Sequence, residues 1–244
     1  MLGIERDGRG ERNTVDTAGT NAKAVPHSQT LDRGIRVLEV LGDADGPLSI
    51  AQLAGELDVH RSIVYRILRT LESHRLVSRR GDGACELAPG LATLARGVSR
   101  DLRTAALPEL TAAANDLGMT CFLVVPDRDE CITLVSVEPR HAVAVAQRPG
   151  SRHPIEQGAP GLALLAALPA KASERDEVGQ CRERGYAKSH SEVIRGLTSI
   201  AVPVPGQGEA PCAIAVVYVD TDEDAEQISA RLNQATKAVA AELD

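Results

Sequence analysis

The segment Arg61-Ser-Ile-Val-Tyr-Arg-Ile-Leu-Arg-Thr-Leu71 determines how the N-terminal part of this chain folds. In a helix each residue turns by about 100°, so the side chains of the segment separate into two arcs. One arc is apolar and holds Ile63, Val64, Ile67, Leu68 and Leu71. The other arc presents Arg61, Ser62, Tyr65, Arg66 and Arg69. This pattern predicts an amphipathic helix that buries one face in a core and offers three guanidiniums, a phenol and a hydroxyl to a partner.

Two further helices are predicted before this segment. Residues 31–42 carry apolar side chains at helical spacing. Ser49 is placed as the N-cap of the second helix, with Gln52 three residues later as its capping-box partner. Only a short break at residues 58–60 separates that helix from Arg61. Two helices joined by so short a turn are typical of a DNA-binding helix-turn-helix.

A hairpin is predicted directly after the arginine-rich helix. Two short β-like runs flank Gly81-Asp82-Gly83, whose glycines are expected to supply the positive φ angles of a tight turn. Arg79 and Arg80 precede that turn. The hairpin completes a winged helix-turn-helix domain, which we assign to residues 30–88.

Charge is distributed unevenly along the chain. The formal net charge is −7, but the segment from His60 to Arg80 holds six arginines and one acidic residue. Such a basic cluster is an electrostatic footprint for phosphate. Recognition of single strands depends on aromatic stacking, and the chain has no Trp, one Phe and three Tyr, so we predict duplex DNA as the partner. The expected DNA-contacting residues are Ser49, Arg61, Ser62, Tyr65, Arg66, Arg69, Arg79 and Arg80.

Alternatives to DNA contact stay open for these side chains. The arginines of residues 61–69 also fit the solvated face of an ordinary surface helix, and Arg79 and Arg80 also fit an exposed hairpin. His60 and His74, at the two ends of the predicted helix, are candidates for phosphate contact or for capping.

The rest of the chain divides into a tail, a connector and a larger domain. Residues 1–29 show no sustained period and are expected to form a mobile tail. Pro89 suits the first position of a connector helix over residues 89–104. Residues 105–244 are predicted to form an α+β domain, an antiparallel sheet with flanking helices. Its expected elements are helix 105–118, strands 120–125, 131–137 and 141–147, helices 158–168 and 173–184, strands 199–204 and 212–220, and helix 223–243.

Composition argues against several other classes of protein. No apolar run reaches the roughly 18 residues of a membrane span, and residues 1–29 lack the apolar core of a signal peptide, so a cytoplasmic location and no membrane partner are expected. The five cysteines are widely spaced and include no Cys-x-x-Cys pair, so they suit neither a disulfide framework nor a zinc site. They are expected to be reduced and mostly buried.

Two rival functions have weaker support in the sequence. An enzyme would need Cys121 or Cys181 as nucleophile with His141, His153 or His190 as base, and no short motif places such a pair together. A DNA-bundling protein would not need an acidic C-terminal domain with a Gly-Ala-x-Gly loop. We therefore expect no catalytic activity, no cofactor and no metal.

Eight stretches, taken in order, resemble the IclR-type transcriptional regulators. The N-terminal ones are Leu31-Asp-Arg-Gly-Ile-Arg-Val-Leu38, Leu48-Ser-Ile-Ala-Gln-Leu-Ala54, the 61–71 segment and residues 83–87. The C-terminal ones are Pro149-Gly-Ser-Arg-His-Pro-Ile155, Gly158-Ala-Pro-Gly-Leu-Ala-Leu-Leu165, Arg184-Gly-Tyr-Ala187 and Gly196-Leu-Thr-Ser-Ile-Ala-Val-Pro-Val204. The resemblance covers residues 30–244. It implies a GAF-like effector domain, a homodimer or dimer of dimers, and palindromic operators near genes for small-molecule catabolism.

The resemblance also implies an effector pocket in the C-terminal domain. Carried over motif by motif, its lining is Gly158, Ala159, Ser189, Ser199, Ala215 and Val217. Small residues at the start of the 158–168 helix are expected to leave backbone N–H groups free for an anionic oxygen. Few polar partners favour a ligand with substantial apolar surface, such as an aromatic or branched acid. Glu156 and Leu162 stand where many relatives have His and Lys, which argues against a copied carboxylate site.

Overall fold

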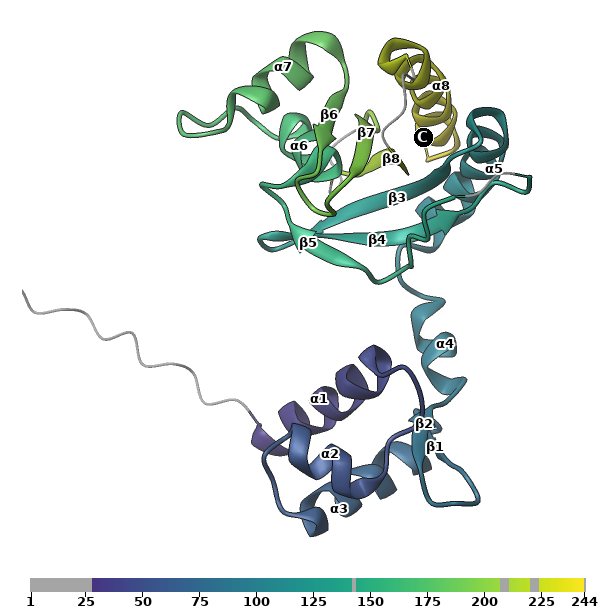
Figure 1. Ribbon diagram of the computed structural model, residues 1–244, viewed down its shortest axis with the longest axis vertical. Helices are drawn as coiled ribbons and strands as arrows, with labels where there is room; N and C mark the ends of the chain where they lie inside the picture. Colours follow the sequence, from purple (N-terminus) through teal and green to yellow (C-terminus); the bar gives the residue numbers. More distant parts are fainter. Residues whose placement is uncertain (1–27, 142–143, 207–210, 220–223, 244) are drawn as a thin grey trace, which may run out of the picture. The chain divides into compact units, whose positions relative to one another are not determined.

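The computed structural model describes residues 28–141, 144–206, 211–219 and 224–243 (Figure 1). The chain separates into two compact units, one ending at Ala95 and one beginning at Arg96. The expected tail of residues 1–29 lies outside the described residues apart from its end, because Ser28 caps the first helix and Gln29 begins it.

The N-terminal unit begins with three helices and a hairpin (Figure 1). In chain order these are α1 (Gln29–Asp43), α2 (Ile50–Glu56), α3 (Arg61–Ser73), β1 (Val77–Arg79) and β2 (Cys85–Leu87). Their apolar faces meet in one core, whose fully buried members include Val37, Leu53, Val64, Leu68 and Cys85. The predicted order of a winged helix-turn-helix is present, and the apolar arc of α3 is the arc that packs.

The turn between β1 and β2 uses one glycine rather than two. Gly83 has a φ of +85°, whereas Gly81 is not among the positive-φ residues of the described chain. The side chain of Asp82 accepts a hydrogen bond from the Ala84 N–H at 3.0 Å. An Asx turn therefore replaces the second positive φ angle that the sequence led us to expect.

Ser49 caps α2 as the capping-box pattern predicts. The Ser49 hydroxyl accepts the Gln52 N–H at 3.3 Å and lies 2.7 Å from Gln52 Oε1. Gln52 Oε1 in turn accepts the Ser49 N–H at 2.9 Å. These reciprocal bonds satisfy backbone donors that the start of a helix leaves unpaired.

Replacing Ser49 with alanine is expected to destabilise the N-terminal unit by about 1 kcal/mol, because the cap of α2 is lost. Ser49→Asp keeps an acceptor at the cap and adds a negative charge that the helix start favours, so its stability should remain near that of the parent. Urea unfolding followed by circular dichroism measures both variants. Equal stability of the alanine variant and the parent would contradict the capping role.

The connector over residues 89–104 is not one helix, which corrects the prediction. Two helices take its place, α4 (Gly90–Ala95) and α5 (Arg100–Leu117). Ser99 has a φ of +43°, a left-handed conformation that interrupts the helical hydrogen-bond ladder. Ala106 and Leu110 of α5 are fully buried in the core of the C-terminal unit. The second of the two helices therefore packs as part of the larger unit.

A six-stranded antiparallel sheet forms the centre of the C-terminal unit, in the order β5-β4-β3-β8-β7-β6. Its strands are β3 (Thr120–Asp127), β4 (Glu130–Val137), β5 (Arg152–Pro154), β6 (Ala187–His190), β7 (Leu197–Pro203) and β8 (Ala213–Val219). The remaining helices are α6 (Gly158–Ala167), α7 (Asp176–Arg184) and α8 (Ala225–Leu243). The α+β class, with an antiparallel sheet and flanking helices, is confirmed.

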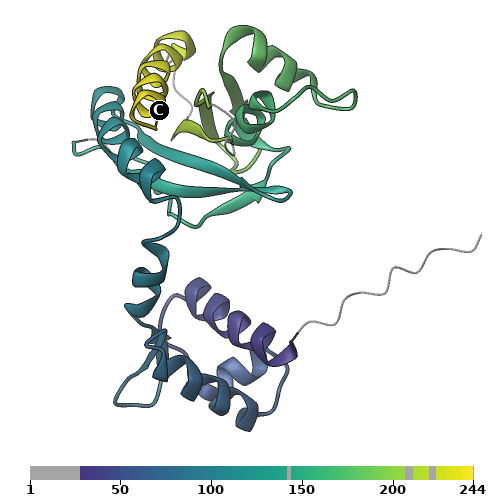
Figure 2. The same cartoon turned by 180° about the vertical axis from the view of Figure 1, so that it is seen from behind.

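Helices cover both faces of this sheet (Figures 1 and 2). Helices α5 and α8 pack on one face, α6 packs on the other, and α7 packs against α6. In β8, Ile214 and Val216 belong to the core under α5 and α8, whereas Ala215 and Val217 belong to the core under α6. Because alternate side chains enter different cores, this central strand is apolar along its whole length.

Two assignments along the sheet differ from the sequence prediction. The strand expected at residues 141–147 is not formed in its described part, where the Gln147 side chain instead donates to the Thr133 hydroxyl at 2.8 Å. Strand β5 takes the edge beside β4. Strand β6 is missing from the prediction, because Ala187-Lys-Ser-His190 has one apolar residue, and its alternation between buried and exposed residues is seen only in the structure.

Candidate functional site

The exposed face of α3 gathers basic and polar side chains in the N-terminal unit. The exposed residues of α3 include Arg61, Ser62, Tyr65, Arg66 and Arg69. Val64 and Leu68, on the opposite face, are fully buried. Among the described residues, the three α3 guanidiniums form no hydrogen bond or ion pair. A helix that buries one face and presents three unpaired guanidiniums on the other has the chemistry to bind base edges in a major groove.

The hydroxyl groups near the start of α3 already have partners. His60 Nδ1 accepts the Ser62 N–H at 3.3 Å and lies 2.8 Å from Ser62 Oγ, so His60 serves as the N-cap of α3. The Ser49 hydroxyl is likewise engaged with Gln52. A shallow hollow beside these caps is lined by Ile50, Ala51, Arg61, Ser62, Tyr65 and Arg66.

Arg79 and Arg80, the two arginines of the β1–β2 hairpin (the wing), are paired within the protein. Arg79 Nε donates to Glu72 Oε1 at 2.9 Å, and the Arg79 guanidinium lies 5.7 Å from the centroid of the Tyr65 ring. Arg80 Nε donates to Glu86 Oε2 at 2.9 Å. The contacts of Arg79 join the wing to α3. Because an acidic partner offsets each wing charge, the arginines of α3 are the stronger candidates for DNA contact.

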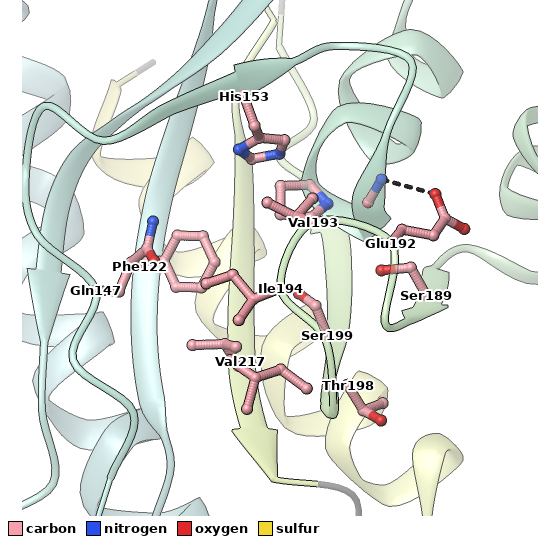
Figure 3. A pocket seen from close by; sticks show the side chains of 13 residues that line it. Phe122, Gln147, His153, Ser189, Glu192, Val193, Ile194, Thr198, Ser199 and Val217 are labelled. Carbon is pink, nitrogen blue, oxygen red and sulfur yellow. Dashed lines mark hydrogen bonds between the residues drawn. The ribbon is translucent and has the colours of Figure 1, made fainter.

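A second candidate site is a cavity of about 50 Å³ between the start of α6 and the sheet (Figure 3). Its lining includes four of the six residues that the family resemblance implies, namely Gly158, Ser189, Ser199 and Val217. Ala159 and Ala215 do not line it. Both are fully buried in the core under α6, where they allow the helix to approach the sheet.

The first two backbone N–H groups of α6 are not free, contrary to the expectation from the sequence. The Ala159 N–H donates to Ser189 Oγ at 2.7 Å, and the Gly158 N–H donates to Glu192 Oε2 at 2.9 Å. Arg175 holds the same carboxylate through Nη1 at 2.9 Å and Nη2 at 3.2 Å. The hydrogen bonds from Arg175 hold the pKa of Glu192 below its usual range.

The serines implied as ligand partners also have hydrogen bonds inside the protein. Ser199 Oγ donates to the Val216 carbonyl at 2.7 Å. Ser189 accepts from Ala159 and so keeps its own hydroxyl proton available to a ligand. Several lining residues were missed from the sequence, including Phe122, Gln147, His153, Glu192, Val193 and Ile194. No local pattern marks them, because only the folded sheet brings their segments together.

The helix-turn-helix segment matches a known family model. Residues 30–81 match the IclR helix-turn-helix domain. The chain is 31% identical over 212 residues to Probable transcriptional regulator SauR of Cupriavidus necator, an alignment that covers 77% of this chain and 84% of that protein. The chain belongs to the IclR family. Proteins of this family are DNA-binding transcriptional regulators, so the basic face of α3 lies in a domain of matching function.

Solved IclR-family structures share the fold of both units. An IclR transcriptional regulator from Alicyclobacillus acidocaldarius is 26% identical with a TM-score of 0.76, covering 90% of this chain and all of that one. An IclR homolog from Microbacterium hydrocarbonoxydans, solved in complex with 4-hydroxybenzoate, is 21% identical with a TM-score of 0.78. That alignment covers 88% of this chain and 98% of the homolog. In this IclR-family chain, no helix of the described part is long and apolar enough to cross a membrane.

One Cys–His pair lies at the pocket of this IclR-family protein, but it lacks the features of a catalytic pair. Cys131 Sγ is 2.9 Å from His153 Nε2. Burial raises the pKa of Cys131 to about 12 and lowers the pKa of His153. Burial also raises the pKa of Cys121 to about 12 and that of Cys181 to about 11. Thiols held neutral are poor nucleophiles, which disfavours these cysteines as catalytic groups. The matched relatives are named as transcriptional regulators and not as enzymes.

Proposed function

We propose that this IclR-family regulator binds a palindromic operator as a homodimer, and that a small, partly apolar organic acid bound in the C-terminal unit changes its operator affinity. The observation that carries the proposal is the exposed face of α3, whose three guanidiniums have no partner among the described residues. A protein that acts on DNA in this way would work in the cytoplasm.

The proposed DNA contacts follow from the chemistry of each side chain. Arg61, Arg66 and Arg69 can each hold the O6 and N7 of a guanine or a phosphate oxygen. Arg79 holds Tyr65 beside the wing, where the phenol can reach a phosphate. Arg80 is placed for a contact to the backbone or the minor groove. Ser49 and Ser62, whose hydroxyls are engaged at helix starts, would exchange those hydrogen bonds for a phosphate oxygen.

A homodimer is proposed because one recognition helix reads only a few base pairs. Two copies related by a two-fold axis would place their α3 helices in half-sites about one helical turn apart. Exposed apolar side chains are available for such an association. Leu31 and Ile35 lie one turn apart on α1 and are 64% and 48% exposed, and Leu94 of α4 is 65% exposed. Apolar side chains left in water favour burial against another copy.

The proposed effector class follows from the walls of the cavity. Phe122, Leu197 and Val217 supply an apolar surface, while the Ser189 hydroxyl supplies a polar group beside the start of α6. An aromatic or branched acid matches this division. The relative that was solved with 4-hydroxybenzoate suggests that compound as a first probe.

Selection from random DNA duplexes tests the proposal. The full-length chain should enrich inverted repeats with half-sites about one helical turn apart, and light scattering of the complex should show an even number of copies. Adding 4-hydroxybenzoate or a related aromatic or branched acid should change the affinity measured by mobility shift. Failure to enrich any sequence, or enrichment of sites without two-fold symmetry, would contradict the DNA-binding part. A panel of such acids without any effect on affinity would contradict the effector part.

A further inference from the structure

The loop between β6 and β7, residues 191–196, enters the cavity of the C-terminal unit. Its base is closed by two hydrogen bonds, from the Gly196 N–H to Ser191 Oγ at 2.9 Å and from the Ser191 N–H to the Leu197 carbonyl at 2.8 Å. Residues 192–194 at its tip all line the cavity. A loop with a closed base and its tip in the cavity can enter or leave the site as one piece.

Glu192 occupies the part of the cavity that is suited to a carboxylate. Its two oxygens take the Gly158 N–H and both Nη atoms of Arg175. Its side chain is only 28% exposed. His153 is the basic side chain that does line the cavity, and burial lowers its pKa, which disfavours its charged form. One carboxylate can therefore be held at this end of the cavity by the Gly158 N–H and by Arg175, which is not itself part of the lining, and the protein's own Glu192 occupies that place.

The two residues after Glu192 occupy the apolar part of the same cavity. Figure 3 shows Val193 and Ile194 among the lining side chains, with Ile194 between Phe122 and Ser199. Val193 packs so closely on Gly158 that a Cβ added there would lie 2.8 Å from Val193 Cγ2. The remaining space of about 50 Å³ has room for one or two waters, whereas pockets for small ligands measure roughly 300–1,000 Å³.

We propose that loop 191–196 is an internal occupant of the effector pocket, and that the effector is a monocarboxylic acid with an aromatic or branched body that displaces it. The inference rests on the proposed function, since it names the ligand class of that same pocket. The tip of the loop reproduces both halves of such a ligand, with Glu192 as the acid group and Val193 and Ile194 as the apolar body. An incoming carboxylate can take over the bonds to Gly158 and Arg175 while Glu192 moves into water. A neutral ligand of the same shape has no charge to offer Arg175 in exchange.

Chemical rescue by acetate tests the carboxylate half. In the full-length Glu192→Ala variant the site is vacated, so sodium acetate should raise the midpoint of thermal unfolding in a concentration-dependent way, relative to sodium chloride at equal ionic strength. The parent should not respond. Glu177→Ala is the matched control, because Glu177 also pairs with Arg175, at 2.9 Å, but does not line the cavity. This control should behave as the parent does.

Competition by benzoate tests the displacement. Benzoate should bind Glu192→Ala at least about tenfold more tightly than it binds the parent in calorimetry, and benzamide should show no such gain. Glu192→Gln, which keeps an acceptor for the Gly158 N–H without the charge, should fold like the parent and bind benzoate with an affinity between those of the parent and the alanine variant. In the parent, benzoate should increase hydrogen exchange of residues 191–196, because the loop leaves the cavity.

Three results would overturn the inference. Acetate could stabilise all variants equally, benzoate could bind Glu192→Ala or Glu192→Gln more weakly than the parent, or loop 191–196 could become more protected when benzoate binds. Each would make Glu192 a bystander or a direct ligand contact instead of a displaced occupant. Operator selection separates this inference from the proposed function. If the chain enriches no DNA sequence but acetate still stabilises Glu192→Ala, the proposed operator binding is contradicted. The proposal that loop 191–196 occupies the pocket is then still supported.

Discussion

Replacing Arg61 and Arg66 together with alanine is expected to lower affinity for the selected operator by roughly a hundredfold or more. A bidentate contact from arginine to guanine is worth about 1–3 kcal/mol, and about 1.4 kcal/mol changes affinity tenfold. Both side chains are exposed and have no partner in the described chain, so their loss should leave the free protein folded. Fluorescence anisotropy with the operator and with a scrambled duplex measures the effect on specific and non-specific binding.

The matched control removes the same charge from another helix of the unit. Arg33→Ala combined with Arg36→Ala takes two positive charges from α1 and leaves α3 intact. It should weaken binding to both duplexes by similar, smaller factors, because it changes only the long-range field. If this control weakened operator binding as much as the α3 variant did, net charge would explain the effect and α3 would not be the reading element.

Gly161→Ala is expected to destabilise the C-terminal unit by about 3 kcal/mol, at the upper end for an overpacked core. A Cβ at this position would lie 2.1 Å from the Ile155 carbonyl oxygen and 2.8 Å from its carbon. Those atoms are backbone, so the start of α6 would have to move away from the segment that precedes it. Calorimetry should show the unfolding midpoint of this unit falling by about 6–12 °C, since about 1 kcal/mol shifts it by about 2–4 °C at this size.

Gly179 provides the matched control for that substitution. It lies within α7, and a Cβ added there would meet nothing within 4 Å. Gly179→Ala should leave stability unchanged or raise it by up to about 1 kcal/mol, because alanine favours a helix interior over glycine. A Gly161→Ala protein as stable as the parent would show that α6 does not approach Ile155 so closely. The cavity wall formed by Gly158 and Pro160 at the start of α6 would then lie in a different place.

Local patterns were sufficient for most of the N-terminal unit. The capping pair of Ser49 and Gln52, the amphipathic spacing of residues 61–71 and the glycine at position 83 each act within a few residues. Interactions of such short range can be inferred from spacing because the backbone geometry of a helix or a turn is known beforehand. The same reasoning failed at Ser99, where a left-handed residue divides a stretch whose composition suits a continuous helix.

In the C-terminal unit the apolar runs and turns of the sequence determined the class of the fold. The region of the pocket was expected from the family resemblance, through motifs such as the small residues from Gly158 to Gly161, and it stays a prediction. Only the tertiary structure decided which residues fill the pocket and which of the expected lining residues are buried in the core under α6 instead. Glu192 meets Gly158 across 34 positions of the chain. Ala159 and Ala215, which were expected to face a ligand, lie together in the core under α6 instead. Periodicity assigns a side chain to a face of its own element, but the neighbour across that face is set by how distant strands and loops pack together, and such contacts leave no local signal in the sequence.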